Sequence, residues 1–176
     1  KLMHLIDVKS PADLKGLSLA ELTDLTAQAR QALMTKVSEH GGHVGPPMGA
    51  AEMIMALHYV FNSPVDKIVY DVSHQSYVHK MVTGRALAFL DHNHYDDVTG
   101  YTDPTESEHD FFNIGHTSTS ISLASGLATA RNLKGDSENI IAIIGDGSLS
   151  GGEAFEGLDY AATLDSNMII IVNDND

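Results

Sequence analysis

The sequence predicts an α/β fold, a doubly wound parallel sheet with helices on both faces. Residues 140–144 and 168–172 are continuous apolar runs, and they flank a helical segment at about 151–163. Apolar runs without alternation are typical of parallel strands buried on both faces. A strand–helix–strand of this length predicts a right-handed βαβ unit. The hydrophobic content of 43% over 176 residues is sufficient for one sizeable core.

The N-terminal part predicts two helices around a loop. Residues 18–40 begin with Ser18 and Glu21 in the spacing of a capping box, and apolar residues follow at helical intervals. Residues 41–49 hold four glycines and two prolines, a composition that predicts a loop. Residues 50–61 are strongly apolar and predict a second helix.

The middle of the chain predicts a strand, a helix, a long loop and another helix. Residues 68–72 are short and β-branched, and a helix is expected at about 76–90. Residues 91–113 show no period and are rich in Asp, His, Thr and Pro, which indicates a functional or mobile surface loop. Residues 117–133 predict a helix of small residues packed close to the sheet. No repeat or linker divides the chain, so one domain over 1–176 is expected.

Charge and composition exclude several classes of partner. Ten Lys and Arg against 24 Asp and Glu give a formal charge of -14, which disfavours nucleic acid and anionic membranes. The chain has no Cys, and therefore no disulfide, thiolate nucleophile or zinc thiolate site, which fits a reducing cytoplasm. The apolar runs are far shorter than the ~20 residues of a membrane helix. We therefore expect a cytoplasmic protein that binds neither nucleic acid nor a membrane.

Polar motifs follow both apolar strands. The first strand ends in Gly145-Asp146-Gly147-Ser148 and the second in Asn173-Asp174-Asn175-Asp176. Ligands bind beyond the carboxyl ends of parallel strands, and glycines let backbone N–H groups approach a phosphate. The 25 residues between Gly147 and Asn173 fit one helical crossover. If the two strands are neighbours, Asp146 and Asn175 can therefore offer hard oxygen ligands to one Mg²⁺.

The charge of this region also favours a metal-held phosphate. Residues 135–176 contain nine acidic residues and no Lys or Arg, so an anionic ligand there needs a cation. A divalent metal ion supplies that cation. The alternative is that the first motif is merely a turn and the second a polar strand end. Their combination at βαβ spacing favours a functional site.

The paired motifs resemble the metal–diphosphate motif of thiamin diphosphate enzymes, and further motifs narrow the resemblance. Four segments occur in the order seen in 1-deoxy-D-xylulose 5-phosphate synthases. They are Gly41-Gly42-His43, the run Asp-Val-Ser-His-Gln-Ser-Tyr at 71–77, Glu-Ser-Glu-His-Asp at 106–110, and Gly-His-Thr-Ser-Thr-Ser-Ile-Ser at 115–122. The resemblance runs along nearly the whole chain.

The resemblance implies a thiamin diphosphate-binding fold with thiamin diphosphate and Mg²⁺ as cofactors. His43 and His74 are the implied catalytic residues, because a neutral imidazole transfers protons near neutral pH. Asp146 and Asn175 are the implied metal ligands. The remaining histidines match no compact zinc motif. The implied cofactor-binding set is His74, His116, Ser118, Gly145, Asp146, Gly147, Ser148 and Asn175.

The implied reaction is the decarboxylative condensation of pyruvate with glyceraldehyde 3-phosphate, a transferase step of isoprenoid and thiamine biosynthesis. A transketolase-like ketol transfer with a different acceptor remains an alternative, as does a non-catalytic phosphate-binding α/β domain. Three departures from the family bear on this choice. Residues 101–105 lack the basic residue expected before Glu106, Ser73 stands where the family usually has Gly, and Pro46-Pro47 replace a proline-free stretch.

The resemblance also implies a longer enzyme. The chain corresponds to the diphosphate-binding domain and lacks the pyrimidine-binding domain of such enzymes. We therefore expect residues 1–176 to be a fragment that is inactive alone. The pyrimidine-binding domain would be supplied in cis or in trans, and the enzyme is expected to be a homodimer.

Overall fold

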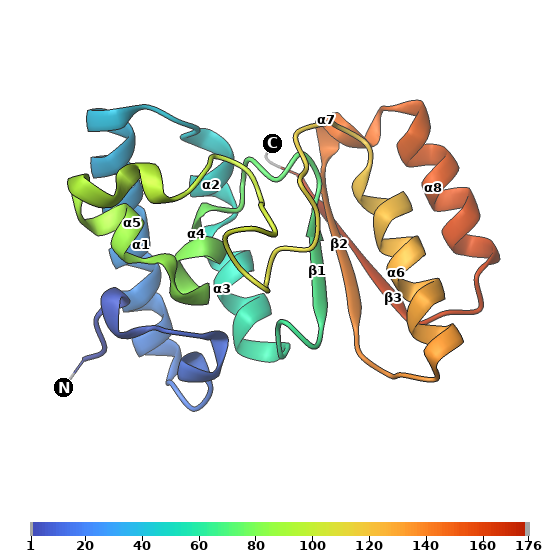
Figure 1. Cartoon of the computed structure of the whole chain (residues 1–176), viewed down its shortest axis with the longest axis horizontal. Coiled ribbons are helices and arrows are strands. Elements are labelled where there is room, and N and C mark those ends of the chain that lie inside the picture. The colour runs from blue at the N-terminus through green and yellow to red at the C-terminus, as the bar shows by residue number, and fades with distance from the viewer. Residues whose placement is uncertain (1, 175–176) are drawn as a thin grey trace. The chain divides into compact units, whose positions relative to one another are not determined.

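The computed structural model describes residues 2–174 and divides the chain into two compact units. Unit 1 comprises Lys1–Asn62 and His74–Gly100, and unit 2 comprises Ser63–Ser73 and Tyr101–Asp176. Figure 1 labels the helices and strands of both. Unit 1 is helical and unit 2 contains the sheet, so the predicted combination of helices and parallel strands is confirmed.

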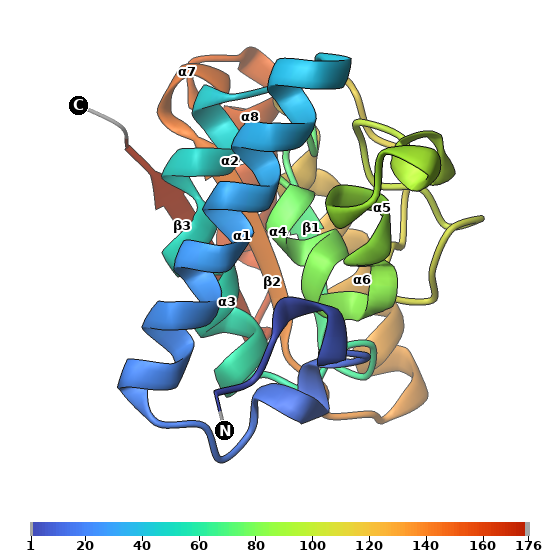
Figure 2. The ribbon, with the colours of Figure 1, turned by 90° about the vertical axis from the view of Figure 1, so that its left-hand side faces the viewer.

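The two longest helices of unit 1, α1 and α3, contact each other. After two short 3₁₀ helices, Leu5–Asp7 (η1) and Pro11–Leu14 (η2), α1 spans Leu19–His40 and contacts α3, Ala51–Val60. Figure 2 shows both helices facing the viewer. The predicted capping box is present, because Ser18 N–H donates to Glu21 Oε2 at 2.8 Å and Glu21 N–H donates to Ser18 Oγ at 3.3 Å.

The loop predicted over residues 41–49 is wrong in its second half. Residues 41–44 are not helical, but Gly45–Gly49 forms the short helix α2. Proline is tolerated in a first helical turn, because the N–H groups there have no partner within the helix and proline's φ suits it. Pro46 and Pro47 lie in the first turn of α2, where prolines are compatible with a helix.

The single helix predicted at 76–90 is also wrong, because the structure breaks it. The segment consists of α4 (Tyr77–Lys80), a π-type turn (Met81–Arg85) and α5 (Leu87–Leu90). The break lies at Gly84, whose φ of +95° is the left-handed conformation. A Cβ there would lie 2.8 Å from the carbonyl oxygen of Lys9, so the close approach of another segment requires glycine. In the following loop, His92–Asp97 forms a 3₁₀ helix (η4).

Unit 2 contains a parallel sheet with the strand order β1-β2-β3. The strands are β1 (Lys67–Tyr70), β2 (Ile140–Gly145) and β3 (Met168–Asn173), at the predicted places. β1 ends two residues earlier than predicted, because Val72 and Ser73 have φ values of +57° and +72°, which no strand accommodates. β2 and β3 are neighbours, and Gly145 pairs with Asn173.

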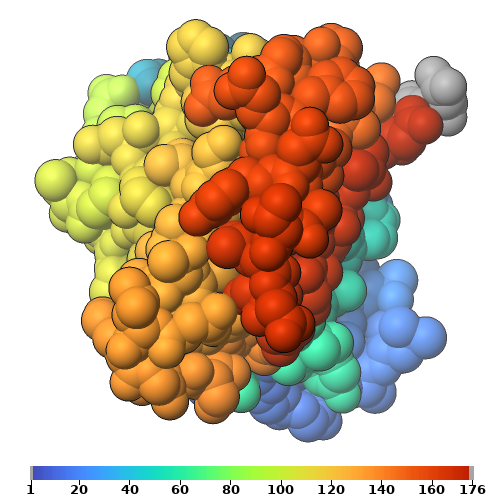
Figure 3. All heavy atoms as spheres, turned by 90° about the vertical axis from the view of Figure 1, so that its right-hand side faces the viewer, coloured from blue at the N-terminus to red at the C-terminus, as the bar shows by residue number. Residues whose placement is uncertain are grey.

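Two helices pack on one face of this sheet. α6 (Ser120–Lys134) contacts all three strands and packs against α8 (Gly152–Thr163). Figure 3 shows α8 in orange-red along the surface of unit 2. β2 is buried as predicted, whereas β3 is only half-buried and Val172 is 46% exposed. The prediction that both strands are buried on both faces is therefore wrong for β3, because α6 packs mainly over β1 and β2 and covers β3 less.

Between β2 and α8 the structure adds the short helix α7, Asp146–Leu149, which the sequence did not predict. The core of unit 2 forms where α6 faces the strands, and it includes Ile121, Ala124 and Ala128 of the helix. Within residues 2–174, no helix has the length and apolar character needed to cross a membrane.

Candidate functional site

The predicted site residues are distributed over both units. His43 and His74 belong to unit 1. Asn175 lies outside the described residues. Unit 2 contains the remaining predicted residues, which are His116, Ser118, Gly145, Asp146, Gly147 and Ser148.

In unit 2, the two polar motifs lie at the same edge of the sheet. Asp146 directly follows β2 and begins α7, and β3 runs parallel to β2 with Asn173 opposite Gly145. Asp146 and Gly147 are exposed. A Cβ on Gly145 or Gly147 would meet no atom within 4 Å, so the backbone of this turn is open to a ligand.

A buried carboxylate at the end of β1 fixes the start of α6. Asp71 is 1% exposed, and its two oxygens accept the N–H groups of Ser118 at 2.9 Å and Ser120 at 3.0 Å. Its own N–H donates to the carbonyl oxygen of Ile143 in β2 at 2.8 Å. A negative charge is favourable at the N-terminus of a helix, where N–H groups lack intrahelical partners. Asp71 therefore sets the path of the segment that carries His116 and Ser118.

Ser118 connects this segment to the turn after β2. Its hydroxyl donates to the carbonyl oxygen of Ser148 at 2.7 Å, and its φ is +71°. Gly151 leaves room for this contact, because a Cβ there would lie 1.9 Å from Ser118 Oγ. The predicted residues Ser118 and Ser148 are therefore brought together by a direct hydrogen bond.

His116 is exposed beside a small cavity of unit 2. Its Nδ1 lies 2.8 Å from the carbonyl oxygen of Thr117, and a carbonyl can only accept. Nδ1 therefore carries a hydrogen, and in the neutral ring Nε2 is the acceptor. The cavity has a volume of about 330 Å³ and is lined by Asn113, Ile114, Gly115, His116, Thr119, Ser122, Leu123 and Glu153.

In unit 1, the two predicted catalytic histidines lie together. The His43 and His74 rings are 5.5 Å apart between centroids, in an edge-to-face arrangement. His43 N–H donates to the Tyr77 hydroxyl at 3.1 Å, and His43 Nδ1 lies 3.0 Å from the same oxygen. A cavity of about 250 Å³ adjoins His43 and is lined by Lys36, His40, Gly41, Gly42, His43, Tyr77, Phe89, Tyr95, Val98, Thr99 and Gly100.

Lys36 stabilises the wall of this cavity. It is buried, and its Nζ donates to the carbonyl oxygens of Ala88 and Tyr95, both at 2.9 Å. The ammonium also lies 4.3 Å from the centroid of the Phe89 ring, a favourable cation–π distance. These contacts join α1 to α5 and to the loop after it.

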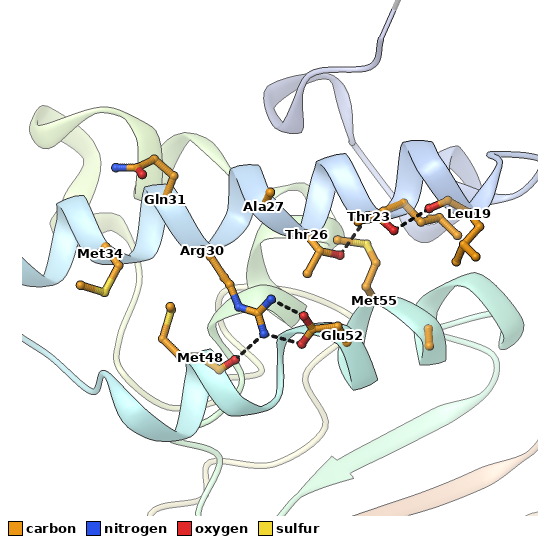
Figure 4. A pocket seen from close by; sticks show the side chains of 12 residues that line it. Leu19, Thr23, Thr26, Ala27, Arg30, Gln31, Met34, Met48, Glu52 and Met55 are labelled. Atoms are coloured by element: carbon orange, nitrogen blue, oxygen red, sulfur yellow. Dashed lines mark hydrogen bonds and ion pairs between the residues drawn. The ribbon is translucent and has the colours of Figure 1, made fainter.

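A larger groove of unit 1 contains none of the predicted residues. It lies between α1 and α3, has a volume of about 590 Å³, and is shown in Figure 4. Arg30 forms an ion pair with Glu52 there and donates to the carbonyl oxygen of Met48 at 3.1 Å. The Arg30 guanidinium lowers the pKa of Glu52. The groove is otherwise mainly apolar, with Met34 and Met55 in its wall.

Comparison with known proteins identifies the family. The family model described as 1-deoxy-D-xylulose-5-phosphate synthase matches residues 5–176. The chain belongs to the 1-deoxy-D-xylulose-5-phosphate synthase family. This is a family of transferases, and the resemblance inferred from the motifs is confirmed.

Curated synthases are similar along nearly the whole chain. The protein named 1-deoxy-D-xylulose-5-phosphate synthase from Symbiobacterium thermophilum is 50% identical over 173 residues, which cover 98% of this chain and 27% of that protein. The protein of the same name from Shouchella clausii is 48% identical over 174 residues, covering 99% and 28%. The chain thus spans about a quarter of the length of these synthases.

The residues at the strand ends fit the Mg²⁺ and diphosphate that this synthase family uses. Asp146 offers an exposed carboxylate oxygen, and Mg²⁺ binds few protein groups while phosphates and waters complete its shell. Residues 2–174 contain no cluster of three or more His, Asp or Glu that could hold a metal ion by protein ligands alone. A site that shares the metal with a phosphate needs no such cluster.

Three residues that position these sites were not predicted as site residues from the sequence. Asp71 and Tyr77 occur in the motif at 71–77, but only the fold shows which groups they contact. A sequence signal existed for Asp71, because it is an acidic residue within the otherwise apolar strand predicted over 68–72. For Gly151 no signal existed, since its role depends on the position of Ser118.

Proposed function

We propose that the chain is the diphosphate-binding domain of a thiamin diphosphate-dependent transferase, which condenses pyruvate with glyceraldehyde 3-phosphate to 1-deoxy-D-xylulose 5-phosphate. The supporting observation is that the two polar motifs follow neighbouring parallel strands in register, Gly145 opposite Asn173. Membership of the synthase family supports the same function. In this proposal the domain covers residues 1–176 and is a doubly wound, thiamin diphosphate-binding fold with helices on both faces.

Unit 2 would bind the anionic end of the cofactor. Asp146 and Asn175 would coordinate Mg²⁺, and the N–H groups of Gly147 and Ser148 would donate to the diphosphate, together with contacts from the 116–118 segment and Gly145. The region needs the metal ion, because residues 135–176 contain no cationic Lys or Arg. When bound, thiamin diphosphate supplies the electron sink for decarboxylation.

Unit 1 would supply proton transfer. His43 and His74 lie with their rings 5.5 Å apart, and a neutral imidazole can hold a proton at one nitrogen and accept one at the other. We assign His43 to proton exchange with the reacting oxygen of the substrate. His74 would contact the cofactor and assist this exchange.

The proposal includes further parts of the enzyme. The matched synthases are almost four times as long as this chain, so a pyrimidine-binding domain in cis or in trans would complete the site. The chain would be inactive without it. The whole enzyme would act as a cytoplasmic homodimer in the synthesis of isoprenoid precursors and thiamine.

The direct test is product analysis with the intact enzyme that contains this chain. Pyruvate labelled at its carboxyl carbon is supplied with thiamin diphosphate, Mg²⁺ and glyceraldehyde 3-phosphate. The proposal predicts labelled carbon dioxide and a five-carbon phosphorylated ketose in equal amounts. Ketol transfer without carbon dioxide would instead indicate a transketolase-like activity. Binding of phosphates without selectivity for thiamin diphosphate would indicate a non-catalytic domain.

A further inference from the structure

Two atoms of His43 contact one tyrosine hydroxyl in unit 1. The backbone N–H of His43 donates to Tyr77 Oη at 3.1 Å, and the ring Nδ1 lies 3.0 Å from the same oxygen. The hydroxyl therefore fixes both the backbone and the imidazole of this residue. A contact of this kind sets the orientation of a ring and the nitrogen that carries its hydrogen.

Hydrogen-bond chemistry fixes the polarity of the first contact and allows the second to run the other way. A backbone N–H can only donate, so the hydroxyl oxygen is the acceptor in the first contact. The hydroxyl also carries one hydrogen of its own, which it can donate to Nδ1. We propose that Tyr77 is a positioning residue that donates to Nδ1 of His43 and holds the ring as the tautomer with hydrogen on Nε2.

Two glycines from separate segments leave room for this contact. A Cβ on Gly42 would lie 3.0 Å from Tyr77 Oη, and a Cβ on Gly100 would lie 3.2 Å from it. The Gly100 Cβ would also come within 3.7 Å of the His43 ring. A side chain at either position would therefore displace the Tyr77 hydroxyl, whereas the His43 imidazole would be in ordinary van der Waals contact. The absence of side chains at Gly42 and Gly100 thus leaves space on two sides of the Tyr77–His43 pair.

Tyr77 is itself well placed to hold another residue. It begins α4, is 5% exposed, and its ring lies 5.7 Å from the Phe89 ring between centroids. A buried ring packed in this way has little freedom, so its hydroxyl is fixed in position. In this tautomer of His43, Nε2 would be the nitrogen that donates a hydrogen to a substrate oxygen. This catalytic consequence rests on the proposed function, whereas the tautomer does not.

The test compares Tyr77→Phe with a matched control in the intact enzyme. Tyr95 is equally buried and lines the same cavity, but its hydroxyl donates to Glu39 Oε2 at 3.0 Å. Histidine-selective ¹⁵N labelling and NMR at alkaline pH, with the His43 signals assigned by their loss in His43→Ala, report which ring nitrogen carries the hydrogen. Steady-state kinetics measure kcat and KM in the same samples.

We expect hydrogen on Nε2 of His43 in the wild type and in Tyr95→Phe, and a mixture of tautomers in Tyr77→Phe. Turnover of Tyr77→Phe should fall about 10- to 100-fold with KM little changed, as expected when a reacting group is misplaced. Gly100→Ala should shift both readouts in the same direction by a smaller amount. The added Cβ displaces the Tyr77 hydroxyl without removing it. Gly100→Ala therefore still tests the proposal if Tyr77→Phe does not fold.

Three results would overturn the proposal. Hydrogen on Nδ1 in the wild type, or an unchanged tautomer in Tyr77→Phe, would show that Tyr77 does not set the tautomer of the ring. A changed tautomer with unchanged turnover would show that the contact has no catalytic role. Failure of the proposed function is distinguishable from all three, because a wild-type enzyme without carbon dioxide release would still report its His43 tautomer.

Discussion

The two units hold their predicted site residues in different ways. In unit 2, the buried carboxylate of Asp71 binds backbone N–H groups at the start of α6, and the Ser118 hydroxyl binds a backbone carbonyl after β2. In unit 1, the Tyr77 hydroxyl contacts the His43 ring, so one side chain positions another. Unit 2 therefore fixes the path of loops, whereas unit 1 fixes the orientation of one imidazole.

The contrast extends to His116 of unit 2 and His43 of unit 1. His116 Nδ1 donates to a backbone carbonyl, which no side-chain substitution at Thr117 removes. His43 Nδ1 faces a hydroxyl that one substitution deletes. We infer that variants of the residues that set the 116–118 segment in unit 2 should change cofactor binding and stability together, and that variants of His43 or Tyr77 in unit 1 should change turnover alone. The first of the following predictions test that separation, and the others measure contacts outside it.

The largest effect on turnover is expected from His43→Ala in the intact enzyme. Loss of a proton-transferring group should lower kcat by about 10²–10⁴. Cofactor affinity should change little, because the proposed diphosphate contacts lie in unit 2. Steady-state kinetics and calorimetry with thiamin diphosphate measure the two quantities. Normal turnover would assign His43 a packing role and remove the proposed difference between the units.

A smaller effect, on both stability and affinity, is expected from Asp71→Asn. The amide keeps the shape but can accept only through its oxygen, so one of the two N–H groups at the start of α6 loses its partner. We expect the free energy of unfolding to fall by about 1–3 kcal/mol. Thiamin diphosphate should bind about 10-fold more weakly, because the 116–118 segment shifts.

The matched control for that variant is Asp66→Asn, also in unit 2. Asp66 is buried and accepts the Asn139 N–H at 2.7 Å, at the opposite, amino end of β2. Denaturant unfolding should show a loss of stability in both variants. Only Asp71→Asn should weaken cofactor binding, and equal weakening in the two would mean that Asp71 acts through global stability alone.

Gly151→Ala tests the link between Ser118 and the turn after β2. Its Cβ would lie 1.9 Å from Ser118 Oγ, so the Ser118 side chain must move and its bond to Ser148 is lost. We expect a destabilisation of about 1–3 kcal/mol, as in other overpacked sites. The Cβ of the neighbouring variant Gly152→Ala would meet no atom within 4 Å, so its effect on stability should be neutral or slightly favourable. Equal thermal unfolding of the two variants would contradict the contact.

The smallest effect is expected in the groove between α1 and α3. The guanidinium of Arg30 lowers the pKa of Glu52, so the ionised form contributes stability above the usual Glu pKa of 4.5. That contribution is lost as the pH falls through the lowered pKa of the folded state. Because the Glu52 side chain is 62% exposed, Glu52→Gln should cost about 0.5 kcal/mol or less near neutral pH.

Denaturant unfolding of wild type and Glu52→Gln at several pH values checks this prediction. The difference between the two proteins should shrink as the solution is acidified below pH 4.5. A difference that grows on acidification would have the wrong sign for a salt bridge. Turnover should be unaffected, because no predicted site residue lines this groove.

Periodicity and capping signals predicted the regular elements well. The capping box at Ser18 and the apolar runs of β2 and β3 depend on local sequence alone, and so does the polar character of the strand ends. The neighbouring positions of β2 and β3 supplied the condition on which the predicted Mg²⁺ site depended. Family motifs added the histidines, of which His43 and His74 do lie together.

The features that could not be predicted depend on distant contacts. The break at Gly84 arises from the carbonyl of Lys9, and the roles of Asp71 and Tyr77 arise from segments 47 and 34 residues away. Ser73 is instructive, because its φ of +72° explains why glycine suits this position. Its hydroxyl accepts the Thr102 N–H at 2.9 Å and donates to Ile114 O at 3.0 Å, contacts that offset the strain.

The central claim is that the end of β2 holds a metal-bound diphosphate, and calorimetry on Asp146→Ala in the intact enzyme tests it most directly. Thiamin diphosphate is titrated with and without Mg²⁺ into the wild type, Asp146→Ala and Asp136→Ala. Asp136 is an exposed carboxylate of the same acidic region, placed before β2 rather than after it. We expect Mg²⁺-dependent binding in the wild type and in Asp136→Ala, and its loss in Asp146→Ala. Unchanged affinity in Asp146→Ala would contradict the account.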